Sequence, residues 1–194
     1  MKITLLGTGT SQGVPVIACD CNVCKSNNSK DKRLRSSVMI DVDSKTFVID
    51  TGPDFRQQML REGVERVDAI LFTHHHKDHV AGMDDVRAFN YRWNKDMQIY
   101  CSDRTEVALR KEFPYVFAAK KYPGTPKVEV KMIQNRPFKI QETTGLLPLF
   151  ALNEEGYKRI IELSSLSFLN NSELLDPHID LKDLLNNNEG VAIF

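Results

Sequence analysis

The chain has 194 residues, and its 26 basic and 26 acidic side chains cancel to a formal net charge of zero. That length suggests one domain with a sizeable core, and the balanced charge provides no field to attract nucleic acid or an anionic membrane. No apolar window is long enough to span a bilayer, and the apolar start at residues 1–6 is too short for a signal peptide. We therefore expect a cytoplasmic protein that does not act on a membrane.

The first expected strand, residues 3–6, leads into a glycine-rich loop at residues 7–13. The third glycine falls one residue late for a dinucleotide-binding fingerprint, and Val14-Pro15 stands where a helix should begin. The loop is therefore interpreted either as the lining of a pocket or as a structural turn.

Cysteines are crowded in the next segment, where Cys19, Cys21 and Cys24 lie within six residues. In a cytosolic chain such crowding favours a metal site over disulfides. Three thiolates at this spacing can hold one tetrahedral zinc ion, which would take a fourth ligand from elsewhere. The alternative is three free thiols.

A basic run at residues 30–35 is either a solvated loop or a place where Arg33 or Arg35 helps attract a phosphate. Two alternating segments, 37–42 and 45–49, then predict a hairpin. Asp50 follows the second strand. It could orient a metal-bound histidine, or it could be a turn residue.

The segment after Asp50 predicts a helix. Asp54 would be the N-cap, with Gln57 three residues later, and Gly63 would end the helix. Phe55, Met59 and Leu60 would form its apolar face.

Four of the five histidines lie in one stretch directly after a predicted buried strand at residues 69–72. An extended backbone would point His74, His76 and Asp78 to one side, and His79 can join them at the turn. Imidazole and carboxylate together suit zinc, iron or manganese. The order also suits two ions that share a hydroxide, with His74 and His76 on one ion and Asp78 with His79 on the other. The alternative is a polar loop.

The remaining elements predicted before residue 140 alternate between helix and strand. They are a helix at 84–93, a strand at 97–101, a helix capped by Asp103 and Glu106 that Pro114 stops, an aromatic loop at 115–126 and a strand at 127–133.

These motifs together resemble the metallo-β-lactamase superfamily, and within it the PhnP-like phosphodiesterases, which act on phosphoribosyl cyclic phosphate. The resemblance rests on residues 1–15, the cysteine group, residues 33–37, residues 49–52 and the His74-x-His76-x-Asp78-His79 motif, and it covers about residues 1–140. It implies a layered α/β fold, the αββα sandwich, and hydrolysis of a small phosphodiester by a hydroxide that bridges two metal ions.

The resemblance also implies the site residues. His74 and His76 would hold the first zinc or manganese ion, and Asp78 and His79 the second, with Asp78 also assigned to catalysis. Cys19, Cys21 and Cys24 would hold a structural zinc. Distant relatives include tRNA 3′-end processing nucleases, but the neutral charge makes nucleic acid an unlikely partner here.

Residues 141–194 depart from the family pattern. One histidine, His178, follows His79, where the family would supply several further ligands. We expect a divergent, mostly helical tail, with helices at 154–163 and 180–185, and a sandwich that is incomplete in its C-terminal half. A non-catalytic remnant with a partial metal site is the alternative to an active enzyme, and a homodimer could cover an exposed sheet face.

Overall fold

The structure is a computed structural model that describes residues 1–133, 140, 149–151, 155, 158–159 and 191–193. The chain divides into two compact units, Met1–Ile133 and Gln134–Phe194. The helices expected at 154–163 and 180–185, and the ligand candidate His178, lie wholly or mostly outside the described residues.

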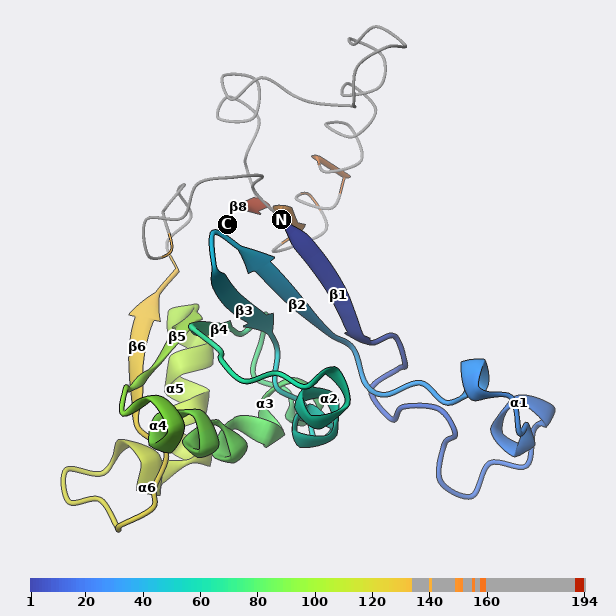
Figure 1. Ribbon diagram of the computed structural model, residues 1–194, viewed down its shortest axis with the longest axis horizontal. Coiled ribbons are helices and arrows are strands. Elements are labelled where there is room, and N and C mark those ends of the chain that lie inside the picture. Colours follow the sequence, from blue (N-terminus) through green and yellow to red (C-terminus); the bar gives the residue numbers. More distant parts are fainter. Residues whose placement is uncertain (134–139, 141–148, 152–154, 156–157, 160–190, 194) are drawn as a thin grey trace, which may run out of the picture. The chain divides into compact units, whose positions relative to one another are not determined.

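The first unit is built on a six-stranded sheet whose strands follow one another in chain order (Figure 1). They are β1 (Lys2–Gly7), β2 (Ser37–Val42), β3 (Lys45–Ile49), β4 (Ala69–Leu71), β5 (Met97–Cys101) and β6 (Val128–Met132). β2 runs antiparallel to β1 and β3, whereas β3 to β6 are parallel. The carboxyl ends of β3, β4 and β5 therefore meet at one edge of the sheet.

The predicted hairpin of β2 and β3 is confirmed. Its two turn residues, Asp43 and Ser44, have φ values of 49° and 60°. Positive φ at both central positions gives a twist that matches the flanking strands, and aspartate tolerates this conformation better than most residues.

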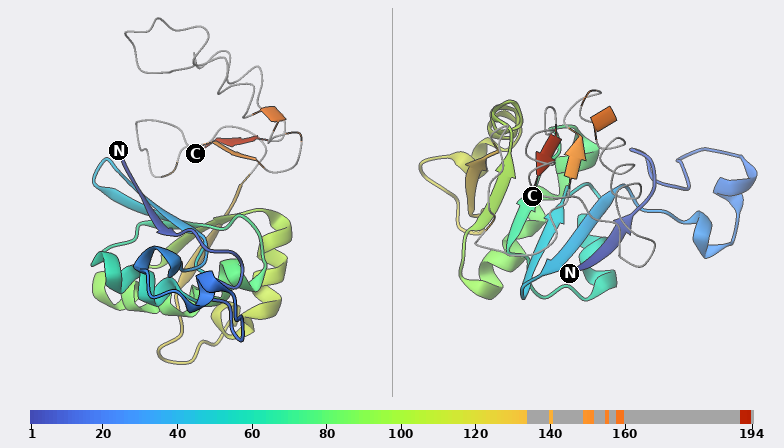
Figure 2. Two further views of the ribbon diagram at one scale, coloured as in Figure 1. Left: turned by 90° about the vertical axis from the view of Figure 1, so that its right-hand side faces the viewer. Right: turned by 90° about the horizontal axis from the view of Figure 1, so that it is seen from above.

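Helices cover one face of this sheet (Figure 2). The helices of the unit are α1 (Asn22–Lys25), η1 (Ser29–Asp31), α2 (Phe55–Glu62), α3 (Lys77–Val80), η2 (Ala81–Val86), α4 (Arg87–Trp93), α5 (Asp103–Glu112) and α6 (Pro114–Phe117). The core between helices and sheet joins Phe55, Met83 and Leu109 to Val48 and Ile70, all of them fully buried. The predicted layered α/β fold is thus confirmed.

Helix α2 has the predicted ends, and Phe55 and Met59 of its predicted apolar face are buried. Gly63 ends it with φ 62°, as expected for a left-handed C-cap. Leu60, however, is 65% exposed, while Gln58 is buried at 1% exposure. The Gln58 side-chain amide donates to the backbone carbonyl of Arg35 at 2.9 Å, so a polar residue takes the inward position because it has a partner there.

The predicted N-cap of α2 has the right position but not the expected capping bond, and the predicted cap of α5 is wrong. Asp54 occupies the cap position of α2 but makes no capping bond. Its carboxylate instead accepts from the Arg35 backbone N–H at 2.8 Å and from the Arg35 guanidinium at 2.9 Å. In α5 the cap is Ser102, whose hydroxyl accepts from the Thr105 N–H, and Pro114, expected only to stop this helix, opens α6.

In the second unit the described residues include an antiparallel pair of strands, β7 (Leu149–Ala151) and β8 (Val191–Ile193). This pair was not expected in a mostly helical tail. Among the described residues of both units, no helix has the length and apolar character needed to cross a membrane.

Candidate metal centre

The predicted site residues come from two neighbouring parallel strands. Asp50 follows β3, and the histidine stretch follows β4, so both leave the sheet at the same edge. The two loops are joined by backbone bonds, with the Thr51 N–H donating to the His79 carbonyl at 2.8 Å. At Gly52 the approach is so close that a Cβ atom would lie 2.2 Å from the Asp78 carbonyl oxygen. Only glycine allows the loops to meet at this distance.

Three imidazole rings gather at this edge. The ring centroids of His74 and His76 are 4.5 Å apart, and those of His74 and His79 are 4.0 Å apart. Asp78 joins them, with its Oδ2 atom 3.2 Å from His79 Nε2. The structure therefore brings together the four residues that the sequence singled out.

The route by which Asp78 arrives differs from the predicted one. Alternation along an extended chain does place His74 beside His76. The chain then turns, because His76 is the N-cap of α3 and Asp78 and His79 lie in its single turn. Helical geometry, rather than a continued strand, brings Asp78 and His79 to the same place.

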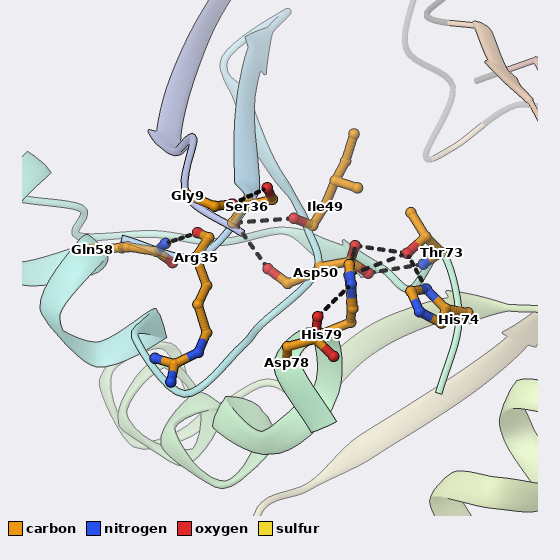
Figure 3. A network of polar contacts seen from close by, with 11 residues as sticks. Gly9, Arg35, Ser36, Ile49, Asp50, Gln58, Thr73, His74, Asp78 and His79 are labelled. Carbon is orange, nitrogen blue, oxygen red and sulfur yellow. Dashed lines mark hydrogen bonds and ion pairs between the residues drawn. The ribbon is translucent and has the colours of Figure 1, made fainter. Parts of the chain in front are cut away.

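Asp50 holds these loops in position. It is 4% exposed and has φ 62°. Its Oδ1 accepts from the Thr73 N–H at 2.8 Å, and its Oδ2 lies 2.7 Å from both the Thr73 hydroxyl and His79 Nδ1 (Figure 3). Of the two roles considered for Asp50, the contact with His79 favours the orientation of a histidine over a simple turn.

The two central histidines have opposite pKa shifts. The hydrogen bond to Asp50 raises the pKa of His79 above its usual value. Burial, followed by the neighbouring charges of His79 and His76, lowers the pKa of His74. A neutral imidazole is the form that binds a metal, so the shift favours that form at His74 and opposes it at His79.

The donor set fits divalent metal ions. Because His79 Nδ1 faces Asp50, its Nε2 is the nitrogen left for a ligand, which is the carboxylate–histidine arrangement common at zinc sites. Imidazole and carboxylate oxygen are the donors that zinc and manganese accept.

The cysteine trio forms a second, separate donor group. The sulfur atoms of Cys19, Cys21 and Cys24 all lie within 4.8 Å of one another. Helix α1 shapes it, since Cys21 is the N-cap and its sulfur accepts from the Cys24 N–H at 3.4 Å. That backbone hydrogen bond, with side-chain bonds to Cys19 and Cys24, lowers the pKa of Cys21 to about 7. Its thiolate is therefore available at neutral pH.

Arg35 and the glycine-rich loop have a structural role. The Arg35 guanidinium binds the Asp54 carboxylate at 2.9 Å and the Ser11 carbonyl at 2.8 Å. A Cβ atom at Gly7 would lie 1.9 Å from the Arg35 carbonyl oxygen. The loop is therefore packed against the Arg35 segment, and the Arg35 side chain is already paired rather than directed at a phosphate.

Sequence reasoning missed Thr73. Its backbone and hydroxyl both contact Asp50, and the hydroxyl lies 3.1 Å from His74 Nδ1. The available signal was its position, a hydroxyl residue between the end of a buried strand and the first histidine.

A mixed sheet with helices on one face and a histidine–aspartate cluster at its carboxyl edge is the architecture of the metallo-β-lactamase fold. Residues 45–159 match the family model of the beta-lactamase superfamily domain, and the chain belongs to this family. The match continues past residue 140, where the resemblance based on the motifs ended.

Solved structures support the same assignment. A crystal structure of a diphosphatase from the PhnP family is 42% identical and covers 71% of this chain and 53% of that one, with a TM-score of 0.63. The zinc-bound PqqB from Methylobacterium extorquens is 24% identical over 77% of this chain and 54% of that one, with a TM-score of 0.59. The similarity to PqqB concerns the fold alone.

Two relatives with different names are similar in sequence. The octanoyltransferase of Porphyromonas gingivalis is 39% identical over 168 residues, which is 81% of this chain and 33% of that protein. Coenzyme PQQ synthesis protein B of Methylobacterium radiotolerans is 33% identical over 101 residues, which is 45% of this chain and 34% of that protein. The chain thus spans about a third of the length of these two relatives.

Proposed function

We propose that this chain carries the metal-binding half of a hydrolase that cleaves a small phosphodiester. The observation that supports it most strongly is the Asp50–His79–Asp78 arrangement. It occurs in a chain whose sequence is 42% identical to that of a PhnP-family diphosphatase. In this proposal His74 and His76 hold one divalent ion and Asp78 with His79 a second, either zinc or manganese. The ions would supply Lewis acidity and a water activated near neutral pH.

The chain's own residues have defined roles in the proposed reaction. Asp50 holds His79 with Nε2 directed toward the site, and the close contact at Gly52 sets the position of Asp78. Burial and its histidine neighbours lower the pKa of His74, which favours the neutral form that binds a metal. These residues therefore orient the donors before a metal arrives, which reduces the ordering cost of binding.

The PhnP-family neighbour is a diphosphatase, which favours a second candidate substrate, a phosphoanhydride. The two substrate classes differ in the leaving group rather than in the displacement at phosphorus. A non-catalytic remnant and a tRNA-processing nuclease are two further candidates, and the zero net charge weighs against the nuclease.

The test combines metal content with hydrolysis. Purified wild type would be analysed by elemental mass spectrometry and assayed with a chromogenic phosphodiester and with inorganic pyrophosphate, in zinc and in manganese. His76→Ala should lower both metal content and turnover. His75→Ala is the matched control, because His75 lies beside His76 with ring centroids 5.3 Å apart but is not among the proposed ligands. Metal content that is low in wild type and unchanged in His76→Ala would favour the remnant.

The affinity of the site for zinc should depend on pH. Below the raised pKa of His79, zinc has to displace a proton, so affinity should rise about tenfold per pH unit and level off above that pKa. Competition with a chromophoric chelator would measure this profile. Asp50→Asn removes the main cause of the shift and should move the bend to lower pH. A profile without a bend, or with one that Asp50→Asn leaves in place, would contradict this assignment.

The cysteine trio should hold a zinc ion of its own. Cys21→Ser is expected to lower the zinc content by one equivalent, because serine is a poor zinc ligand. Cys101→Ser serves as the control. Cys101 lies fully buried in β5, where burial raises the pKa of its thiol to about 12, and its loss should leave the zinc content unchanged. Equal zinc content in Cys21→Ser and wild type would show that the trio is three free thiols.

A further inference from the structure

Thr73 connects the buried carboxylate of Asp50 to His74. Its hydroxyl oxygen lies 2.7 Å from Asp50 Oδ2 and 3.1 Å from His74 Nδ1. Its backbone N–H donates to Asp50 Oδ1 at 2.8 Å, so a second bond to the same carboxylate fixes the residue. Figure 3 shows Thr73 between these two side chains.

The direction of the hydrogen bonds follows from the groups involved. A carboxylate can only accept, so at 2.7 Å the Thr73 hydroxyl has to give its single proton to Asp50. The hydroxyl oxygen is then left as an acceptor toward His74. His74 Nδ1 has to be the protonated nitrogen, because two acceptors 3.1 Å apart would repel one another.

The same reasoning applies directly to His79. Its Nδ1 lies 2.7 Å from Asp50 Oδ2 and has to donate to it. Asp50 therefore determines which nitrogen carries the proton in both histidines, in His79 by contact and in His74 through Thr73. In both rings Nε2 is the nitrogen left without a proton when the ring is neutral. At His79 the Asp78 carboxylate, 3.2 Å from Nε2, favours a second proton there in the metal-free chain.

We propose that Thr73 is a positioning residue that passes the control of Asp50 to His74, so that one buried carboxylate selects the Nδ1–H tautomer of a histidine in each half of the centre. This inference rests on the proposed function, in which His74 and His79 belong to different metal ions. Thr73 contacts no substrate or metal in this scheme. Its effect is to present His74 Nε2 as a ready ligand.

The test uses the full chain, metal-free, with ¹⁵N-labelled histidine. NMR at about pH 8, above the ordinary histidine pKa, reports which ring nitrogen of neutral His74 is protonated. Wild type and Thr73→Ser, which keeps the hydroxyl, should show the Nδ1–H tautomer. Thr73→Val, of nearly the same shape, should shift His74 toward Nε2–H. His79 is the internal control and should not change, since it contacts Asp50 directly. Thr73→Ala removes the hydroxyl too, should Thr73→Val not fold.

Zinc affinity provides a second measurement. Thr73→Val should bind zinc about 10-fold more weakly than wild type, and Thr73→Ser should restore most of the loss. An unchanged His74 tautomer in Thr73→Val or Thr73→Ala would overturn the inference even if zinc binds well. A shifted tautomer in a chain whose wild type binds no zinc would support the role of Thr73 and overturn the proposed function instead.

Discussion

Gly52→Ala is expected to destabilise the protein by about 3 kcal/mol and to weaken metal binding at the same time. The new Cβ atom would lie 2.2 Å from the Asp78 carbonyl oxygen, which belongs to backbone and cannot swing away like a side chain. The two loops would have to separate, and Asp78 and His79 would move with α3. Chemical denaturation and zinc titration of the same preparation would measure both effects.

Gly63→Ala separates this clash from the general cost of replacing a glycine. Gly63 has φ 62°, and a Cβ atom there would meet nothing within 4 Å. Its replacement should cost about 1 kcal/mol through backbone strain alone and leave zinc affinity unchanged. The interpretation of the Gly52 contact would be wrong if Gly52→Ala were no more destabilising than Gly63→Ala and bound zinc as wild type does.

Asp50→Asn is expected to lower zinc affinity by about 10- to 100-fold, the usual range for loss of a group that orients a metal ligand. Asparagine keeps the shape of the side chain and tolerates φ 62°. Its amide, however, carries one acceptor oxygen where the carboxylate has two. One of the bonds from the Thr73 N–H, the Thr73 hydroxyl and His79 Nδ1 should therefore be lost.

Asp68→Asn is the matched control for this variant. Asp68 is likewise 4% exposed, and its carboxylate accepts from the Thr46 N–H and the Arg66 guanidinium, each at 2.9 Å. Its substitution should cost stability without changing zinc affinity, because none of these partners belongs to the proposed centre. Equal losses of zinc affinity in Asp50→Asn and Asp68→Asn would mean that general destabilisation, not the contact with His79, explains the result.

Several features of this chain could be predicted because they depend on residues close together in sequence. The β2–β3 hairpin follows from two alternating segments and a two-residue turn. The histidine cluster follows from the end of a buried strand and the alternation of side chains beyond it, which brings His74 beside His76. The left-handed end of α2 follows from Gly63 alone.

Features that depend on distant partners could not be predicted in this way. Asp54 resembles an N-cap in sequence, but a partner 19 positions earlier, Arg35, takes its carboxylate. Gln58 is buried because the carbonyl of the same Arg35 is there to accept its proton. In both cases tertiary contact outweighs the local preference, since a buried polar group gains more from a fixed partner than from a solvated cap.

The sequence by itself determined which donors are present and that Asp50 and the histidine stretch each follow a predicted strand. Only the tertiary structure decided how they are held. Asp50 is 23 positions from Thr73 and 29 from His79, and only the parallel pairing of β3 with β4 brings the three together. The physical reason is that the protonation and orientation of a histidine depend on the partner of its second nitrogen. For His79 that partner is Asp50, which follows a different strand, and for His74 it is Thr73, which is itself bonded to Asp50.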